Sequence, residues 1–308
     1  MSSDLNNPLG ELTGARQTMS SWARIIGSYA ELPDDYKSSC KSVLQDCKPF
    51  PYVVFAPVNS DARQRSTEKL IFELNGVFHV WERAGKRIVP VTYPLESINT
   101  LEVGSVLLYS WFTINGLTNA GLVSSTMIPF NTVTKRYLLP FISLLRPVPI
   151  DAAEAEWRLE LARFDYLSSI NFKYMNYARE SIVRGEKVIL SIFQPRIRRR
   201  IFKLFGKNFY RTRVYSHLVI LTDKEVILLG EDAQSAEVKG KDGKYGGVWQ
   251  YIPIRNIVAI LLTEANDGLI TLTIRLKFGD QQLERYFEAS NMTTLKDFLR
   301  EYNQIAAK

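Results

Sequence analysis

The stretch KLIFELNGVFHVW, residues 69–81, decides the fold class of this chain. On both sides of Asn75-Gly76 the residues alternate as they do in strands that bury one face. Asn-Gly between two β-rich runs is the strongest short signal for a two-residue hairpin turn. The sequence therefore predicts an antiparallel pair formed by Lys69–Leu74 and Val77–Trp81.

More β-rich runs, each bounded by turn residues, extend outward from this hairpin. The predicted strands are Arg87–Tyr93, Ile98–Val103, Ser105–Ile114, Gly121–Pro129, Lys187–Phe193, Ser216–Leu221, Val226–Leu229, Trp249–Ile252, Ile257–Glu264, Leu269–Lys277 and Leu283–Glu288. Two segments differ from this pattern. Val133–Arg146 is helical or irregular, and Thr293–Gln304 repeats apolar residues at helical spacing. A mainly β chain with some helix, of the α+β class, is expected.

Two faint matches indicate that one unit is used twice. Phe55-Ala56-Pro57 and Phe193-Gln194-Pro195 both follow apolar runs and lie 138 residues apart. Tyr93–Ile98 and Ile252–Ile257 share an apolar–Pro–apolar–two polar–Ile pattern at an offset of 159. Two matches that occur in the same order in both halves of the chain suggest a duplicated domain. The second copy then carries a longer insertion between its two landmarks.

Helical patterns and prolines mark the borders of the two copies. A polar helical stretch precedes each of the two Phe-x-Pro matches, with Tyr36 in the first stretch and Tyr177 in the second, and Pro147 and Pro149 mark the boundary after the first copy. The predicted organisation is a partly helical N-terminal extension at 1–34 with a helix over Thr18–Ala30, a first domain at 35–146, a helical linker at 147–184 and a second domain at 185–308. Two domains also suit a chain of 308 residues.

The second copy resembles the pleckstrin-homology-like (PH-like) superfold, including its GRAM and bacterial PH branches. The resemblance is carried by the strand-rich run Lys187–Glu288, the helix Thr293–Gln304 and the lead-in Ser181–Lys187. The lead-in departs from the bacterial pattern at Arg184, where proline is usual. The resemblance implies two PH-like antiparallel β-barrels or sandwiches in tandem, each with a C-terminal helix, joined by a helical linker.

The positive charge of the chain is concentrated in Lys187–Tyr215. This stretch holds nine basic residues and no acidic one, whereas the whole chain has 39 Lys+Arg, 32 Asp+Glu and a formal charge of +7. The remainder is therefore slightly acidic. A local field of this kind favours an anionic partner.

In PH domains the connection from strand one to strand two often binds phosphoinositide head groups. The resemblance implies an anionic head-group site whose leading candidate residues are Arg211 and Arg213, together with Lys207 or an earlier basic residue. The supporting basic residues are Arg198, Arg200 and Lys203, and the predicted membrane contacts are Phe202, Phe205 and Phe209.

Other readings of the basic stretch stay open. It could dock a protein partner or support self-association, because PH-like domains bind peptides beside strand five or pair through strand edges. It could also be a solvated surface with no specific role. Nucleic acid is disfavoured, because no recognised motif accompanies the charge.

The sequence offers little material for catalysis. His79, His217, Cys40 and Cys47 are its only histidines and cysteines, and none has metal-ligand spacing or a nucleophile partner. The glycine-rich stretch Glu231–Gly247 lacks Walker spacing, so it is read as a hairpin connection. A non-enzymatic binding or scaffold protein, without metal or cofactor, is expected.

No secretory signal or spanning segment is apparent. The most apolar stretches, Val103–Phe112 and Leu138–Leu145, are far shorter than the roughly 20 residues that a transmembrane helix needs. We therefore expect a cytoplasmic protein that can lie peripherally at a membrane.

Overall fold

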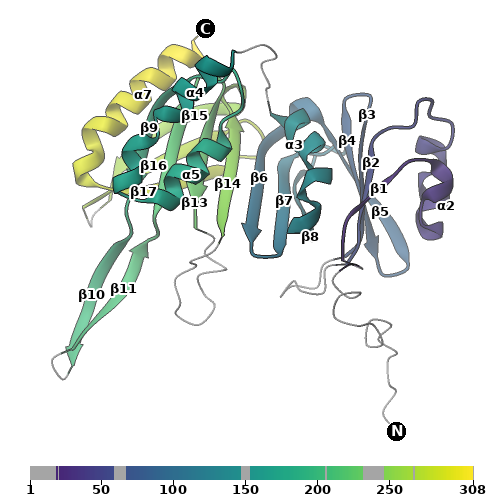
Figure 1. Ribbon diagram of the computed structural model, residues 1–308, viewed down its shortest axis with the longest axis horizontal. Helices are drawn as coiled ribbons and strands as arrows, with labels where there is room; N and C mark the ends of the chain where they lie inside the picture. The colour runs from purple at the N-terminus through teal and green to yellow at the C-terminus, as the bar shows by residue number, and fades with distance from the viewer. Residues whose placement is uncertain are drawn as a thin grey trace.

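The computed structural model describes Met19 and residues 21–58, 67–146, 153–204, 207–231, 246–265 and 268–307. These residues form antiparallel sheets of five, seven, three and two strands, with helices packed on their faces (Figure 1). The expected mainly β fold with helices is confirmed. The sheets are open, so the closed barrel among the two predicted forms is not seen in the described part of the chain.

The first half begins with a five-stranded sheet in the order β1-β2-β3-β4-β5. Its strands are β1 (Arg24–Ile26), β2 (Val53–Ala56), β3 (Lys69–Leu74), β4 (Val77–Ala84) and β5 (Arg87–Pro94), and α2 (Asp34–Leu44) precedes β2. β6 (Ile98–Val106), β7 (Tyr109–Leu117), β8 (Val123–Asn131) and α3 (Leu139–Leu145) follow. The predicted hairpin is confirmed, with Asn75 and Gly76 at φ of 53° and 78° between β3 and β4.

The second half opens with two helices, α4 (Glu154–Ala162) and α5 (Phe172–Ser181). The strands are β9 (Val188–Gln194), β10 (Ile197–Leu204), β11 (Lys207–Val214), β12 (His217–Thr222), β13 (Glu225–Gly230), β14 (Gly247–Pro253), β15 (Ile257–Glu264), β16 (Leu269–Leu276) and β17 (Gln282–Glu288). The chain then enters α7 (Met292–Ala306).

One sheet runs through both halves. Its order is β8-β7-β6-β14-β13-β12-β9, and the halves meet where β14 pairs with β6, with Trp249 opposite Val103. Asn256 adds hydrogen bonds to the carbonyls of Ile98 (2.7 Å) and Asn99 (3.2 Å). The two halves are therefore joined by backbone pairing.

The order of elements in the first half recurs in the second. In each half, the strand that ends at Pro94 or Pro253 is followed by a 3-10 turn, three antiparallel strands and a helix. The first of these three strands also has a register shift at the same place, between Ile98 and Thr100 in β6 and between Ile257 and Ala259 in β15. The second pair of sequence landmarks thus occupies matching positions.

Two tyrosines strengthen the correspondence and revise its alignment. Tyr36 on α2 donates its hydroxyl hydrogen bond to the carbonyl of Glu68, just before β3, at 3.0 Å. Tyr174 on α5 donates to the carbonyl of Ser216, just before β12. The 138-residue offset of the first pair of matches relates Tyr36 to Tyr174, which lies one helical turn before the Tyr177 named from the sequence.

The apolar core has three parts. One buried cluster lies between the five-stranded sheet, β6–β8 and α3, and continues under α5 onto β12–β14. A second fills the space between the other face of β9 and β12–β14, the sheet β15–β17 and α7. A third lies between α2 and the outer face of β2–β4. Burial of this apolar surface is the main stabilising term of the fold.

Three local predictions were wrong. Residues Arg24–Ile26 within the predicted helix Thr18–Ala30 form β1, an extended strand that pairs with β2. The predicted strand Ser105–Ile114 is interrupted by a turn at Leu107-Leu108. The stretch after Pro195, expected as a loop, forms the hairpin of β10 and β11.

Candidate functional site

The basic stretch forms a two-stranded arm, β10–β11, which leaves the body between β9 and β12. Its strands pair only with each other among the described strands, and the hairpin projects away from the sheets (Figure 1). Neither face of the arm is covered by another sheet. Its side chains are therefore presented to whatever lies beside the protein.

Strand register decides which side chains share a face of the arm. Directly opposed residues of an antiparallel pair lie on the same side of the sheet. Arg199 lies opposite Arg211, and Phe202 lies opposite Phe209. Since Arg211 and Phe209 are two residues apart on β11, these two pairs share one face, which we call the Arg–Phe face.

The aromatic pair of the Arg–Phe face is well formed. The Phe202 and Phe209 rings stack with centroids 4.6 Å apart and an interplanar angle of 18°. Their exposed fractions are still 48% and 43%. Ile201 and Tyr210, neighbouring them in the chain, are also exposed. The distal part of the arm therefore exposes large apolar side chains on both of its faces.

The arginines of the arm are exposed as well. They are Arg198, Arg199, Arg200, Arg211 and Arg213. Like charges directly opposite each other on a sheet are destabilising, yet Arg199 faces Arg211. Within the described residues no carboxylate forms an ion pair with either of these two. An external anion between them would relieve the repulsion.

Arg196, at the base of the arm, has a different role. Its guanidinium forms a mostly buried ion pair with Glu231 at 2.7 Å and lies over the Tyr215 ring at 5.7 Å. Lys173 approaches the same carboxylate at 3.7 Å. Arg196 therefore anchors the arm to the body and is not available to a partner.

The other predicted site residues divide into three groups. Arg198, Arg200, Arg211 and Arg213 lie on the arm, and Phe202 and Phe209 are brought together on it. Lys203 and Lys207 belong to its strands, but their side chains lie outside the described residues, as does all of Phe205. Arg211 and Arg213 stand on β11 and not on the second strand of the main sheet, which is β12.

Arg199 was missed by sequence reasoning. A basic–x–basic pattern selects residues along one strand, whereas Arg199 joins Arg211 across two strands. The only available signal was the density of basic residues in the stretch. The pairing of β10 with β11 shifts register between Arg200 and Phe202, and no residue pattern in the sequence predicts this shift.

A second polar cluster lies buried where the halves meet. Arg146, after α3, donates from Nε to Oε1 of Glu225 at 3.0 Å and from Nη2 to the Ser181 carbonyl at 2.7 Å. Its guanidinium lies 3.7 Å from the Tyr251 ring centroid and 3.7 Å from Oε2 of Glu186. This cluster joins one half to the other through a buried cation.

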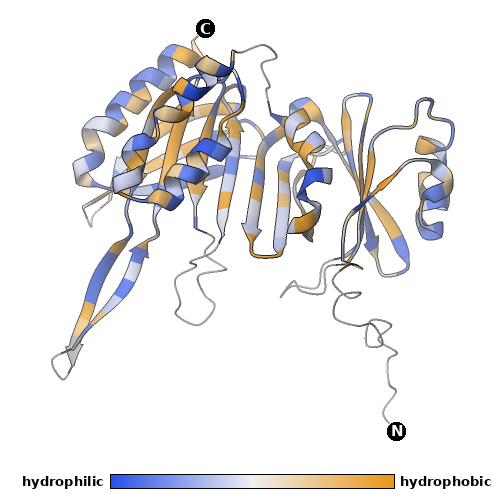
Figure 2. Ribbon diagram, viewed as in Figure 1, coloured by the Kyte–Doolittle hydropathy of each residue, from blue (hydrophilic) through white to orange (hydrophobic). Residues whose placement is uncertain are grey.

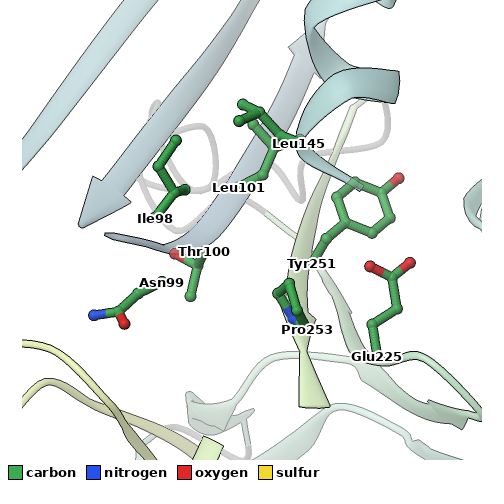
Figure 3. Close-up of a pocket in the computed structure, with 8 residues that line it drawn as sticks. All are labelled: Ile98, Asn99, Thr100, Leu101, Leu145, Glu225, Tyr251 and Pro253. Carbon is green, nitrogen blue, oxygen red and sulfur yellow. The ribbon is translucent and has the colours of Figure 1, made fainter. Parts of the chain in front are cut away.

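Two features of this junction follow from burial. The pKa of Glu186 is raised to about 8, first by burial and then by the nearby Glu225 carboxylate. A cavity of about 10 Å³ lies beside Glu225 and Tyr251, lined also by Asn99 and Leu145 (Figure 3). That volume suits at most a single water molecule. We therefore read the junction as structural.

The two histidines are packed into the core. His79 stacks on Phe72 with centroids 4.5 Å apart, and burial lowers its pKa. His217 contacts the Tyr215 carbonyl through Nδ1 at 3.0 Å and packs against Phe287. Burial lowers the pKa of His217 to about 4. Both rings are accordingly neutral near pH 7.

The sequence matches no protein-family model and no curated protein. No helix in the described ranges is long and apolar enough to span a bilayer.

Proposed function

We propose that this chain is a non-enzymatic binding protein of two PH-like units, which attaches to anionic membrane surfaces through the β10–β11 arm. The observation that carries the proposal is the arm itself. It joins exposed arginines to a stacked, exposed phenylalanine pair on an element that projects from the body. Basic and aromatic groups in this combination favour the interface of an anionic bilayer.

The recurring order of elements supports the PH-like part of the proposal. Four strands, a 3-10 turn, three strands and a helix occur twice, and the arm is inserted between the first and second strands of the second unit. In the superfold that the sequence resembles, this connection is where anionic head groups are often bound. This support is an analogy between folds. The proposed membrane binding is argued from the residues of the arm.

The spacing along the arm suits the layers of a bilayer. The Arg199–Arg211 and Phe202–Phe209 pairs are two residues apart on β11, which is about 7 Å at the usual strand rise. A bilayer of about 40–45 Å with a hydrocarbon core of about 30 Å leaves a head-group layer of about 5–7 Å on each side. The two pairs are therefore close enough to reach one interfacial layer together when the arm lies along the membrane surface.

The cationic contribution is sufficient for reversible attachment. Each basic residue near an anionic surface contributes about 1 kcal/mol, and five arginines of the arm are exposed. The attraction falls off over about 10 Å at 0.1 M salt. We therefore expect binding that strengthens with acidic lipid and weakens with ionic strength.

A second candidate function is a protein-interaction module. β15 pairs only with β16 among the described strands, and Val258 and Leu261 on it are exposed. The matching strand of the first half, β6, is covered by β14. A strand of a partner protein could add to β15 in the same way. Such a contact would be mainly apolar and insensitive to salt.

Co-sedimentation with vesicles tests the first proposal. The probes are phosphatidylcholine vesicles with and without 30% phosphatidylserine, at low and high salt, and the variant is Arg199→Ala/Arg211→Ala. Losing about 2 kcal/mol of attraction corresponds to roughly 30-fold weaker binding. The matched control is Arg158→Ala/Arg300→Ala, which removes two exposed charges from α4 and α7.

Two results would contradict the proposal. One is wild-type protein that remains in the supernatant with acidic vesicles at low salt. The other is equal loss of binding in the arm variant and the control variant, because the attraction would then reflect total charge and not the arm.

A further inference from the structure

The turn between β6 and β7 exposes two leucines. Ser105 pairs with Ser110 and Val106 with Tyr109, which leaves Leu107-Leu108 as a two-residue hairpin turn. Their exposed fractions are 70% and 52%. Turns of this length normally carry Asn-Gly, Asp-Gly or a glycine in the first position. Two leucines at this place break the usual chemistry of a hairpin turn.

The backbone of this turn is also unfavourable for leucine. Leu107 has a φ of 56°, in the left-handed region that costs a side chain steric energy. Every other position of positive φ in the described ranges is Gly, Asn or Asp. Strain and exposure of one large apolar residue together indicate a functional constraint on the turn.

The turn is held in place by its neighbours. Thr132 donates from its hydroxyl to the Leu107 carbonyl at 2.8 Å and from its backbone N–H to the Leu108 carbonyl at 2.9 Å. Val133, next in the chain, is exposed beside them. We call Leu107, Leu108 and Val133 the apolar tip. Lys135 and Arg136 follow directly and give this end of the first half a positive charge.

The apolar tip and the arm lie at the same edge of the seven-stranded sheet. Because neighbouring strands alternate in direction, β9 and β6, four places apart, run the same way. Gln194, at the base of the arm, and Val106, before the turn, therefore end at one edge, about 19 Å apart at the usual strand spacing. In Figure 1 the arm projects from the lower side of the sheets and the β6–β7 turn closes the lower ends of its strands, and this turn is coloured as hydrophobic in Figure 2.

We propose that the apolar tip is a second membrane contact, which inserts into the interfacial zone of an anionic bilayer when the arm is bound. The inference rests on the proposed attachment through the arm. A convex turn is poorly shaped to enter a protein surface without a matching pocket, whereas lipid closes around any protruding apolar group. Arg136, which is exposed, and Lys135, whose Nζ lies 5.9 Å from the Trp249 ring centroid, follow the tip in the chain and add positive charge near it. Two contacts at one edge would also fix the orientation of the molecule.

The substitution Leu107→Gly/Leu108→Ser tests the tip without threatening the fold. Glycine accepts positive φ and Gly-Ser suits a two-residue hairpin, so the variant should be at least as thermally stable as the wild type. Its binding to vesicles with 30% phosphatidylserine should be weaker by about fivefold to tenfold. The matched control is Leu122→Ser, which removes a leucine with an exposed fraction of 67% from the β7–β8 turn at the opposite edge.

Insertion itself is measured with an environment-sensitive NBD label on Leu108→Cys. The background carries Cys47→Ser, since Cys40 is buried and Cys47 is the more accessible native thiol. Acidic vesicles should raise the NBD emission and shift it to the blue, and lipids labelled at shallow acyl positions should quench it.

The outcomes separate the two proposals. If the wild type binds acidic vesicles through the arm but the label does not respond, or if Leu107→Gly/Leu108→Ser binds as the wild type does, the second contact is refuted and the arm stands. If the wild type does not bind vesicles, both proposals fail. A response of the label together with loss of binding in the tip variant, but not in Leu122→Ser, supports the second contact.

Discussion

Arg146 and Arg211 show what an arginine does in two regions of one molecule. Arg146 is buried at the junction, where Glu225, Glu186 and the Tyr251 ring surround its guanidinium. Arg211 is exposed on the arm opposite Arg199, with no carboxylate paired to it in the described ranges. A desolvated charge requires compensation inside the protein, whereas a solvated one leaves its charge for a partner.

The contrast between Arg146 and Arg211 distinguishes charges that stabilise the fold from charges that are exposed to a partner, and it does so more clearly than the amino-acid composition does. Both regions contribute to the net charge of +7. The arm combines exposed arginines with a stacked pair of exposed phenylalanine rings, whereas the junction holds its arginine in a buried cluster that links the two halves. Substitutions in the junction should therefore change stability, and those in the arm should change binding.

The largest effect is expected for Arg146→Ala. Removal of the cation leaves the Glu225 side chain buried without its ion-pair partner, which costs about 3–5 kcal/mol of folding free energy. Urea denaturation followed by circular dichroism measures the loss. Arg211→Ala is the control and should change the free energy of unfolding by less than about 0.5 kcal/mol. Similar losses in both variants would invalidate the contrast.

A smaller effect is expected from the pH dependence of the same junction. The folded chain keeps Glu186 protonated up to about pH 8, whereas the unfolded chain releases that proton near the ordinary value of 4.5. Folding therefore takes up a proton between these values. The contribution of Glu186 to stability is full below about pH 4.5 and is lost progressively as the pH rises to about 8.

Glu186→Gln isolates this contribution. Its free energy of unfolding should not carry the decline between pH 5 and 8, so the difference from the wild type should grow with pH. His217 acts in the opposite direction, because its lowered pKa of about 4 removes stability as the pH falls. Subtracting the two denaturation series cancels His217. A difference that does not vary with pH would show that Glu186 titrates normally.

The sequence predicted those parts of the fold that depend on local signals. Asn75-Gly76 supports positive φ at both residues, so its hairpin was found. The β6–β7 turn was missed because Leu107-Leu108 carries none of the residues that such turns prefer. That failure of local reasoning fell on the very turn for which we infer a function.

Long-range features could not be predicted in this way. Nothing local indicates that β14 pairs with β6, because an exposed strand edge accepts any strand of suitable length. Charge density singled out the stretch that forms the arm, and Arg198 and Arg211 lie on its strands. The pairing of Arg199 with Arg211 depends on register, and register depends on an irregularity that the residue types do not specify.

The smallest effect on stability is expected for Arg199→Glu, which gives Arg211 a counter-charge like the one that Arg146 has. Opposite charges on facing residues contribute about 0.2–1 kcal/mol, and the arm is exposed, so the free energy of unfolding should rise by a few tenths of a kcal/mol at most. Binding to acidic vesicles should nevertheless fall by roughly 30-fold, because the surface charge changes by two. Arg158→Glu on α4 is the matched control, since it makes the same charge change away from the arm. If Arg199→Glu binds acidic vesicles as tightly as the wild type does, pairing the Arg211 charge with a carboxylate does not affect binding. Exposure alone would then not identify an arginine that binds lipid.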